Sequence, residues 1–302
     1  TSHVATSLKI FPFYLWKTLW PAVLSADYPA PVSGSVFDPA VLLSAAAIVA
    51  YAAVLIALRT RRPAAAFGLA FMPAALLPVL NIVPFGIFAA DRYAYLALAG
   101  PCLAAGAVVA ACWKSGGAPA RAAAVAAAVI VIAFAVRTHI RNADWADPVT
   151  FWEATVETSP GSARARTGLG RTYVLGGRID EGIEMLYASL EMDPGMPETY
   201  INIANAWREL GRGDKAAGIL ERGVRANPGS VQLRYNLAVE CVRLEDFRCA
   251  ARELAWVVSA APGFARARES LPVVLGRLRE SMAPEEYEEF VGSLNSNRRI
   301  PD

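Results

Sequence analysis

Two different patterns of apolar and polar residues divide this chain near residue 137. Before that point, uncharged apolar runs alternate with short charged segments, and one run, Pro39–Leu58, has 20 residues without a charge. Such a run is long enough to cross ~30 Å of hydrocarbon at a helical rise of ~1.5 Å per residue. After that point, small and large apolar residues recur at a fixed period among charged ones. We therefore expect an all-α chain with a membrane half and a water-exposed half.

The second half repeats every 34 residues. Prolines mark the period at Pro160, Pro194, Pro228 and Pro262. Three repeats lie in phase, at Ala163–Met196, Pro197–Ser230 and Val231–Phe264. Proline closes the second helix of each pair because it has no amide hydrogen for another turn. This pattern resembles the tetratricopeptide repeat (TPR) and predicts a solenoid of antiparallel helix pairs.

The remaining boundaries follow from the apolar runs. Four membrane crossings are predicted, at Pro39–Leu58, Ala64–Leu80, Tyr93–Trp113 and Ala122–Val136. The expected parts are an interfacial aromatic segment with an extracytoplasmic loop (1–38), a membrane domain with about four transmembrane helices (39–136), a connector with a capping half-repeat (137–162), three TPRs (163–264) and C-terminal capping helices (265–302). The aromatic Phe11–Leu24 fits either the membrane–water interface or the end of an earlier transmembrane helix. Because residue 1 is threonine, we expect a longer parent protein.

Composition agrees with a membrane protein. The chain is 55% hydrophobic, with a mean hydropathy of +0.34, which is too apolar for an ordinary soluble domain. A net charge of +2 without a basic run gives no reason to expect nucleic acid as a partner. Neither His3 nor His139 has a carboxylate or cysteine at ligand spacing, so no metal site is predicted.

The charged segments also predict the orientation. Five basic residues border the apolar runs on one side: Arg59, Arg61, Arg62, Lys114 and Arg121. Basic loops favour the cytoplasmic side, so the TPR array is expected outside the cytoplasm, with the chain in a bacterial inner membrane. Arg137 and Arg141 on the outer side weaken this interpretation slightly.

A family resemblance combines these features. The chain contains LWPAVLSADYP, LLPVLNIVP, DRYAYLALAG and W-x-D-x-x-x-F-W in that order before the TPRs. It resembles the C-terminal half of transmembrane-and-TPR proteins related to the dolichyl-phosphate-mannose protein O-mannosyltransferases and their bacterial counterparts, in the GT-C glycosyltransferase superfamily. The resemblance implies a lipid-phosphate-linked sugar donor and a protein acceptor. The catalytic acidic loop of that family has no counterpart here, so this chain alone is expected to be inactive.

Candidate chemistry in the first half centres on the DRY segment. Arg92 is the expected contact for a lipid phosphate, because a guanidinium forms paired hydrogen bonds to phosphate oxygens, and Tyr93 and Tyr95 would frame that site. Asp91 and Asp27 are the weaker candidates for a catalytic carboxylate. The alternative is that these residues only begin a transmembrane helix at the interface.

The inner face of the TPR array is the second candidate site. Its expected peptide-binding residues are Asn202, Asn236, Asn205, Arg171, Arg208 and Tyr235. An asparagine amide offers a donor and an acceptor, as a peptide backbone does, although solvated asparagines would give the same pattern. The alternative function is thus a membrane-anchored TPR scaffold without chemistry of its own. Cys241 and Cys249 lie on either side of one turn, where two buried thiols are the commoner arrangement and a disulfide is the alternative.

Overall fold

We describe a computed structural model of the chain, which covers residues 2–29, 35–82 and 88–296. The chain forms two compact units, Thr1–Ala165 and Arg166–Asp302. Every regular element within the described ranges is a helix, and the one pairing of extended backbone is an isolated bridge between Tyr28 and Ala89. The prediction of an all-α chain is therefore confirmed for these residues.

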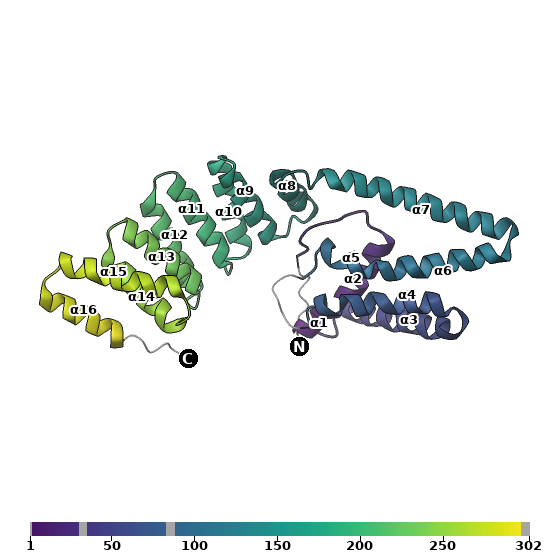
Figure 1. Ribbon diagram of the computed structural model, residues 1–302, viewed down its shortest axis with the longest axis horizontal. Coiled ribbons are helices and arrows are strands. Elements are labelled where there is room, and N and C mark those ends of the chain that lie inside the picture. The colour runs from purple at the N-terminus through teal and green to yellow at the C-terminus, as the bar shows by residue number, and fades with distance from the viewer. Residues whose placement is uncertain (1, 30–34, 83–87, 297–302) are drawn as a thin grey trace. The chain divides into compact units, whose positions relative to one another are not determined.

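The first unit contains the apolar helices (Figure 1). In chain order its elements are α1 (Ser2–Ser7), α2 (Ile10–Leu19), α3 (Pro39–Arg61), α4 (Pro63–Leu76), the 3₁₀ turns η1 (Leu77–Val79) and η2 (Asp91–Tyr93), α5 (Ala94–Ala97), α6 (Ala99–Ser115), α7 (Gly117–Ala143) and α8 (Pro148–Thr158). Local chemistry explains two of the starts: Asp38 and Asp147 each accept hydrogen bonds from the first backbone N–H groups, and proline follows at the first helical position.

Two of these helices, α3 and α7, are long and apolar enough to cross a membrane. A third span is formed if the segments Asp91–Ala97 and Ala99–Ser115, which meet at a bend of 43°, are counted together. The predicted crossing Ala64–Leu80 falls in Pro63–Val79, an apolar helical stretch shorter than a full span. The predicted crossing Ala122–Val136 lies within α7, which continues to Ala143 because nothing before Asp144 interrupts its backbone hydrogen bonds.

Small residues bring α4 and α6 into close contact. A Cβ atom placed on Gly68 would lie 2.6 Å from the carbonyl oxygen of Gly100, and one on Gly100 would lie 2.4 Å from the oxygen of Gly68. Both neighbours are backbone atoms, so no side-chain rotation would relieve the clash. Close approach at small residues is a common way for helices to pack within membranes.

The second half has the predicted helix pairs (Figure 1). The pairs are α9 (Ala163–Leu175) with α10 (Ile179–Met192), α11 (Pro197–Glu209) with α12 (Gly213–Ala226), and α13 (Val231–Arg243) with α14 (Phe247–Ala260), followed by α15 (Ala265–Ser281) and α16 (Pro284–Ser296). Equivalent helices begin 34 residues apart, as at Pro197 and Val231. The core between the pairs is apolar, with Leu186, Ile203 and Leu220 fully buried.

The turn within each pair has the same geometry. Gly177 and Gly211 adopt positive φ angles of 82° and 71°, and Glu245 adopts 61° at the same place in the third repeat. In each turn the next residue donates its N–H to a carbonyl five residues earlier, for example Asp246 to Cys241. Glycine is the residue that accepts this left-handed conformation at little cost, so Glu245 departs from the repeat at a strained position.

A disulfide joins the two helices of the third repeat. The Sγ atoms of Cys241 on α13 and Cys249 on α14 are bonded. The sequence favoured two separate thiols here, and this is corrected: the turn brings the Cα atoms to 5.9 Å, within the range that a disulfide requires. Cys102 and Cys112 on α6 are free thiols.

Candidate functional site

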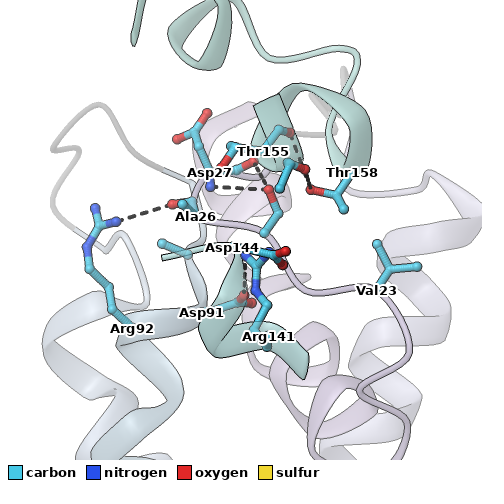
Figure 2. A network of polar contacts seen from close by, with 12 residues as sticks. Val23, Ala26, Asp27, Asp91, Arg92, Arg141, Asp144, Thr155 and Thr158 are labelled. Atoms are coloured by element: carbon cyan, nitrogen blue, oxygen red, sulfur yellow. Dashed lines mark hydrogen bonds and ion pairs between the residues drawn. The ribbon is translucent and has the colours of Figure 1, made fainter. Parts of the chain in front are cut away.

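Asp91, at the start of the DRY segment, is held by a network of polar contacts in the first unit. Tyr28 donates its hydroxyl to one oxygen of Asp91 at 2.7 Å, and the other oxygen lies 3.7 Å from the guanidinium of Arg141 on α7. Figure 2 shows Asp91, Arg141 and Asp144 gathered together, and Arg141 donates to Asp144 at 2.7 Å. Burial, and secondly the negative charge of Asp91, raise the pKa of Tyr28 far above its usual range, so its hydroxyl stays protonated as a donor.

Asp27, the other candidate carboxylate, has a different set of partners. It is buried, and Ser162, in the segment before α9, donates its hydroxyl to one oxygen at 2.6 Å. The guanidinium of Arg164 lies 3.7 Å from the other oxygen. Ser25 donates its hydroxyl to the backbone oxygen of Asp27 and accepts a hydrogen bond from Ser159 at 2.8 Å. Asp27 therefore ties the loop before α3 to the segment that enters the TPR array.

The predicted phosphate contacts are Arg92, Tyr93 and Tyr95, and two of them, Arg92 and Tyr95, line one cavity. Arg92 donates to the backbone oxygen of Ala26 at 3.2 Å and to the Tyr93 hydroxyl at 3.4 Å. In Figure 2 its side chain extends toward Ala26, away from Arg141. Tyr95 is 87% exposed. Ser25 links the two aspartates: its backbone oxygen accepts from the Asp91 N–H, and its hydroxyl donates to the backbone oxygen of Asp27. Arg92 lies against the backbone of the loop between α2 and α3.

A cavity of about 430 Å³ lies beside Asp91. Arg92 and Tyr95 line it, together with residues from α2 and from the last turns of α7. Arg137 and Arg141 are among the α7 residues on its wall, and Trp145 lines it from the turn that follows α7. In the sequence, Arg137 and Arg141 stand out only as topology signals, and the face that they share on the cavity was not predicted. The signal was their spacing: positions 134, 137, 138, 141 and 142 recur every three to four residues and share one side of the helix.

A second site lies on the first helices of the TPR pairs. A cavity of about 550 Å³ is lined by residues of α11, α13 and α15, including Ile201, Tyr235 and Asn236. A neighbouring cavity of about 370 Å³ lies between α13 and α15 and shares Tyr235. The ring of Tyr235 packs against Phe264 with centroids 4.9 Å apart. Two of the six predicted peptide-binding residues therefore line these cavities.

The other predicted peptide-binding residues have different surroundings. Asn202 is buried, and its Nδ2 atom has no hydrogen-bond partner among the described residues. Arg208 donates to the buried carboxylate of Glu240 at 2.9 Å and to Asn205 at 2.8 Å, which joins α11 to α13. Arg171 is exposed on α9 and lines none of the cavities described. The expected ladder of Asn202 and Asn236 is therefore uneven, because one member is enclosed and the other faces the cavity.

Comparison with known proteins supports the repeat and nothing finer. Residues 176–239 match the tetratricopeptide repeat family. No curated protein matches the chain. The matching segment begins in the turn of the first helix pair and ends within α13.

Solved TPR structures are similar to part of the chain. The first TPR of Spaghetti (RPAP3), bound to the HSP90 peptide SRMEEVD, is 21% identical, with a TM-score of 0.36 over 38% of this chain and 92% of that chain. MamA is 18% identical, with a TM-score of 0.39 over 55% of this chain and 92% of that one. YrrB, described as a TPR protein with an unusual peptide-binding site, is 18% identical, with a TM-score of 0.37 over 53% and 79%.

Proposed function

We propose that this chain is a membrane-anchored TPR scaffold that binds an extended peptide segment of a partner protein along α11, α13 and α15. The cavity formed by these three helices is the observation that carries the proposal. A TPR solenoid offers such a surface because every repeat contributes its first helix to the same face.

The lining of the groove indicates which peptide would fit. Tyr235 and Phe264 form an aromatic wall, and Asn236 and Gln232 lie beside it. Asn236 donates one amide hydrogen to the backbone oxygen of Gln232, four residues earlier on α13, and keeps its carboxamide oxygen for a ligand N–H. An extended peptide would place a large apolar side chain against the rings while its backbone bonds to the amides.

Charge should contribute little to this selection. The larger cavity has one acidic residue, Glu198, and one basic residue, Arg266. The smaller cavity is likewise balanced by Glu269 and Arg243, and its remaining wall is mainly valine and leucine. We therefore expect the apolar residue of the peptide, rather than an acidic or basic tail, to decide the affinity.

Membrane anchoring is the second part of the proposal. The helices α3 and α7, with the bent pair that begins at Asp91, supply up to three spans. The shorter apolar helix α4 would lie in the same bundle and cross only part of the hydrocarbon. The basic residues Arg59, Arg61 and Arg62 then lie on the cytoplasmic side and the TPR array outside it. The Cys241–Cys249 disulfide supports that side, because disulfides persist mainly in oxidising compartments.

The scaffold is placed ahead of glycosyl transfer. The comparisons give no link to the O-mannosyltransferases. Both candidate carboxylates already have partners: Asp91 has Tyr28 and Arg141, while Asp27 has Ser162 and Arg164. A general base must be able to reach the acceptor hydroxyl, so these ties argue against catalysis by either residue.

The groove is tested with defined peptides on the full chain in detergent. The probes are fluorescent peptides of Gly, Ser and Asn carrying one central Leu, Phe or Trp, and the same peptides with Asp or Lys at that position. Fluorescence anisotropy should detect binding of the apolar set and roughly tenfold weaker binding of the charged set. Tyr235→Ala should weaken the apolar set roughly tenfold or more, because aromatic contacts dominate such surfaces.

The matched control is Tyr187→Ala. Tyr187 is a half-buried tyrosine on α10 that lines a separate cavity with Trp207 and Lys215. Its loss should leave peptide affinity unchanged, and circular dichroism should show that both variants keep their helix content. Asn236→Ala provides a second groove variant with little effect on the core. Equal peptide affinity in Tyr235→Ala, Asn236→Ala and the unmodified chain would refute the proposed groove.

A further inference from the structure

The cavity of about 430 Å³ beside Asp91 has an unusual balance of charge. Four basic side chains line it: Lys17, Arg92, Arg137 and Arg141. Asp91 is the one acidic residue on the same wall. Asp144 lies behind Arg141 and offsets one further positive charge. The cavity is therefore positive even with both carboxylates ionised.

Three of these basic residues bond to neutral acceptors. Arg137 donates to the backbone oxygens of Pro21 and Ala22, at 3.3 Å and 2.9 Å. Lys17 donates to the backbone oxygen of Val23, and Arg92 to that of Ala26. A carbonyl oxygen satisfies a donor but does not cancel its charge. These contacts fix the loop between α2 and α3 and leave a positive potential at the cavity.

Arg141 adds a donor that lacks an acceptor. Its side chain is 9% exposed. Its Nη1 donates to Asp144, whereas its Nη2 is buried and has no hydrogen-bond partner in the described part of the chain. Asp91 lies 3.7 Å from Nη2, which is an ion-pair distance but too long for a hydrogen bond. A buried N–H of a charged group without an acceptor raises the free energy of the folded protein. An anion that accepts a hydrogen bond from Nη2 would remove this cost, which favours its binding.

Most of the remaining surface of the cavity is apolar, although Thr18, Thr138 and Asn142 also line it. Leu24, Leu98, Phe134 and the ring of Trp145 contribute to its wall. Arg121 and Arg141 are roughly 30 Å apart along α7 at ~1.5 Å per residue, which is the thickness of a bilayer's hydrocarbon core. If α7 crosses the membrane as proposed above, the cavity lies at headgroup level with its apolar wall toward the acyl chains. The occupant should then have both an anionic head and an apolar body.

We propose that this cavity binds the phosphate headgroup of an anionic phospholipid, with Arg141 as its principal contact. Arg137 and Lys17 reinforce the site through their charge, and an acyl chain packs against Phe134 and Leu98. A guanidinium suits this role because its donors match two phosphate oxygens at once. This site lies in the first unit and does not depend on peptide binding by the TPR groove.

The proposal is tested on the purified full chain in a neutral detergent. Thermal stability and native mass spectrometry would be measured with phosphatidylglycerol, with phosphatidylcholine and with inorganic phosphate. Phosphatidylglycerol should raise the melting temperature and remain bound, and the other two should have little effect. Arg141→Gln should weaken phosphatidylglycerol binding roughly 10- to 100-fold, since a charged hydrogen-bond pair is lost.

The matched control is Arg121→Gln. It removes an exposed arginine from the same helix at its other end and should leave the affinity unchanged. If Arg141→Gln does not fold, Arg137→Gln supplies the test, because that residue is half-buried and bonds only to backbone oxygens. Equal stabilisation by phosphatidylglycerol and phosphatidylcholine would overturn the proposal, as would full phosphatidylglycerol binding in the Arg141 or Arg137 variant. Equal protection by inorganic phosphate would overturn the lipid assignment.

Discussion

The strained turn of the third repeat gives a prediction that requires no ligand. Glu245 has a φ of 61° at the position where the first two repeats have Gly177 and Gly211. The side chain of Glu245 is exposed, so the main effect of Glu245→Gly is on the backbone. The surrounding hydrogen bonds already match those of the glycine turns, as Glu245 donates to Val242 and Gly211 to Arg208. The turn can therefore accept glycine without rearrangement.

The size of the effect follows from two opposing terms. A non-glycine residue in the left-handed region costs about 1–2 kcal/mol, and glycine removes that cost. Glycine also gives the unfolded chain more freedom, which returns about 0.5–1 kcal/mol. The net expectation is that Glu245→Gly stabilises the third repeat by about 0.5–1 kcal/mol. Because repeats in a solenoid open locally, a local probe is needed rather than one melting temperature.

Hydrogen exchange of the amides in α13 and α14 is the appropriate assay. Glu245→Gly should slow their exchange by about two- to fivefold under conditions in which exchange reports the opening equilibrium. Gly211→Ala is the matched control: its Cβ would meet no atom within 4 Å, and only the positive φ opposes it. That variant should speed exchange in α11 and α12 by a similar factor. Unchanged or faster exchange in α13 and α14 of Glu245→Gly would refute the argument from strain.

Three further predictions concern packing, oxidation and orientation. Gly68→Leu should lower the stability of the first unit by about 1–3 kcal/mol, because the new Cβ would meet backbone atoms of α6. Gly106→Leu should leave the stability unchanged, because the space around its Cβ is open. Thermal unfolding in detergent would compare the two variants. Reduction of Cys241–Cys249 should destabilise the third repeat by about 2–3 kcal/mol, and before reduction alkylation should reach only Cys102 and Cys112 among the four cysteines. Single cysteines at Arg61 and Gly195, in a chain without native cysteines, should react from opposite sides of the membrane, and labelling of both by an impermeant maleimide on intact cells would contradict the proposed orientation.

The repeats could be predicted from sequence because their information is local and is repeated three times. Each helix pair requires small residues at the contact between its helices, and Gly170 and Gly182 show why: a Cβ on either would lie within 3 Å of the partner helix. Backbone conformation alone explains the proline after each pair and the glycine at the turn of the first two pairs, Gly177 and Gly211. A departure from the pattern in one repeat, such as Glu245 in the third, does not hide the 34-residue period, because the other repeats still show it.

The network around Asp91 could be predicted only in part. The DRY segment stood out as charged residues between apolar runs, and Asp91 and Arg92 were selected for that reason. Their partners were not, because Tyr28 and Arg141 lie 63 and 50 residues away and no local rule brings them together. Arg92 was expected to point to a ligand, but it bonds to the backbone of the loop between α2 and α3. Long-range contacts of this kind depend on the packing of whole helices.

Arg137 and Arg141 bear on both the proposed orientation and the proposed lipid site. In that orientation they lie on the outer side of the membrane, where they oppose the positive-inside rule. In the fold, Arg137 holds the loop after α2, while Arg141 keeps one buried N–H group unused beside a positive cavity. Structure alone requires neither the excess charge nor the unused donor, and a bound anion would account for both. This is why the lipid site is inferred from the residues that the charge rule fits least well.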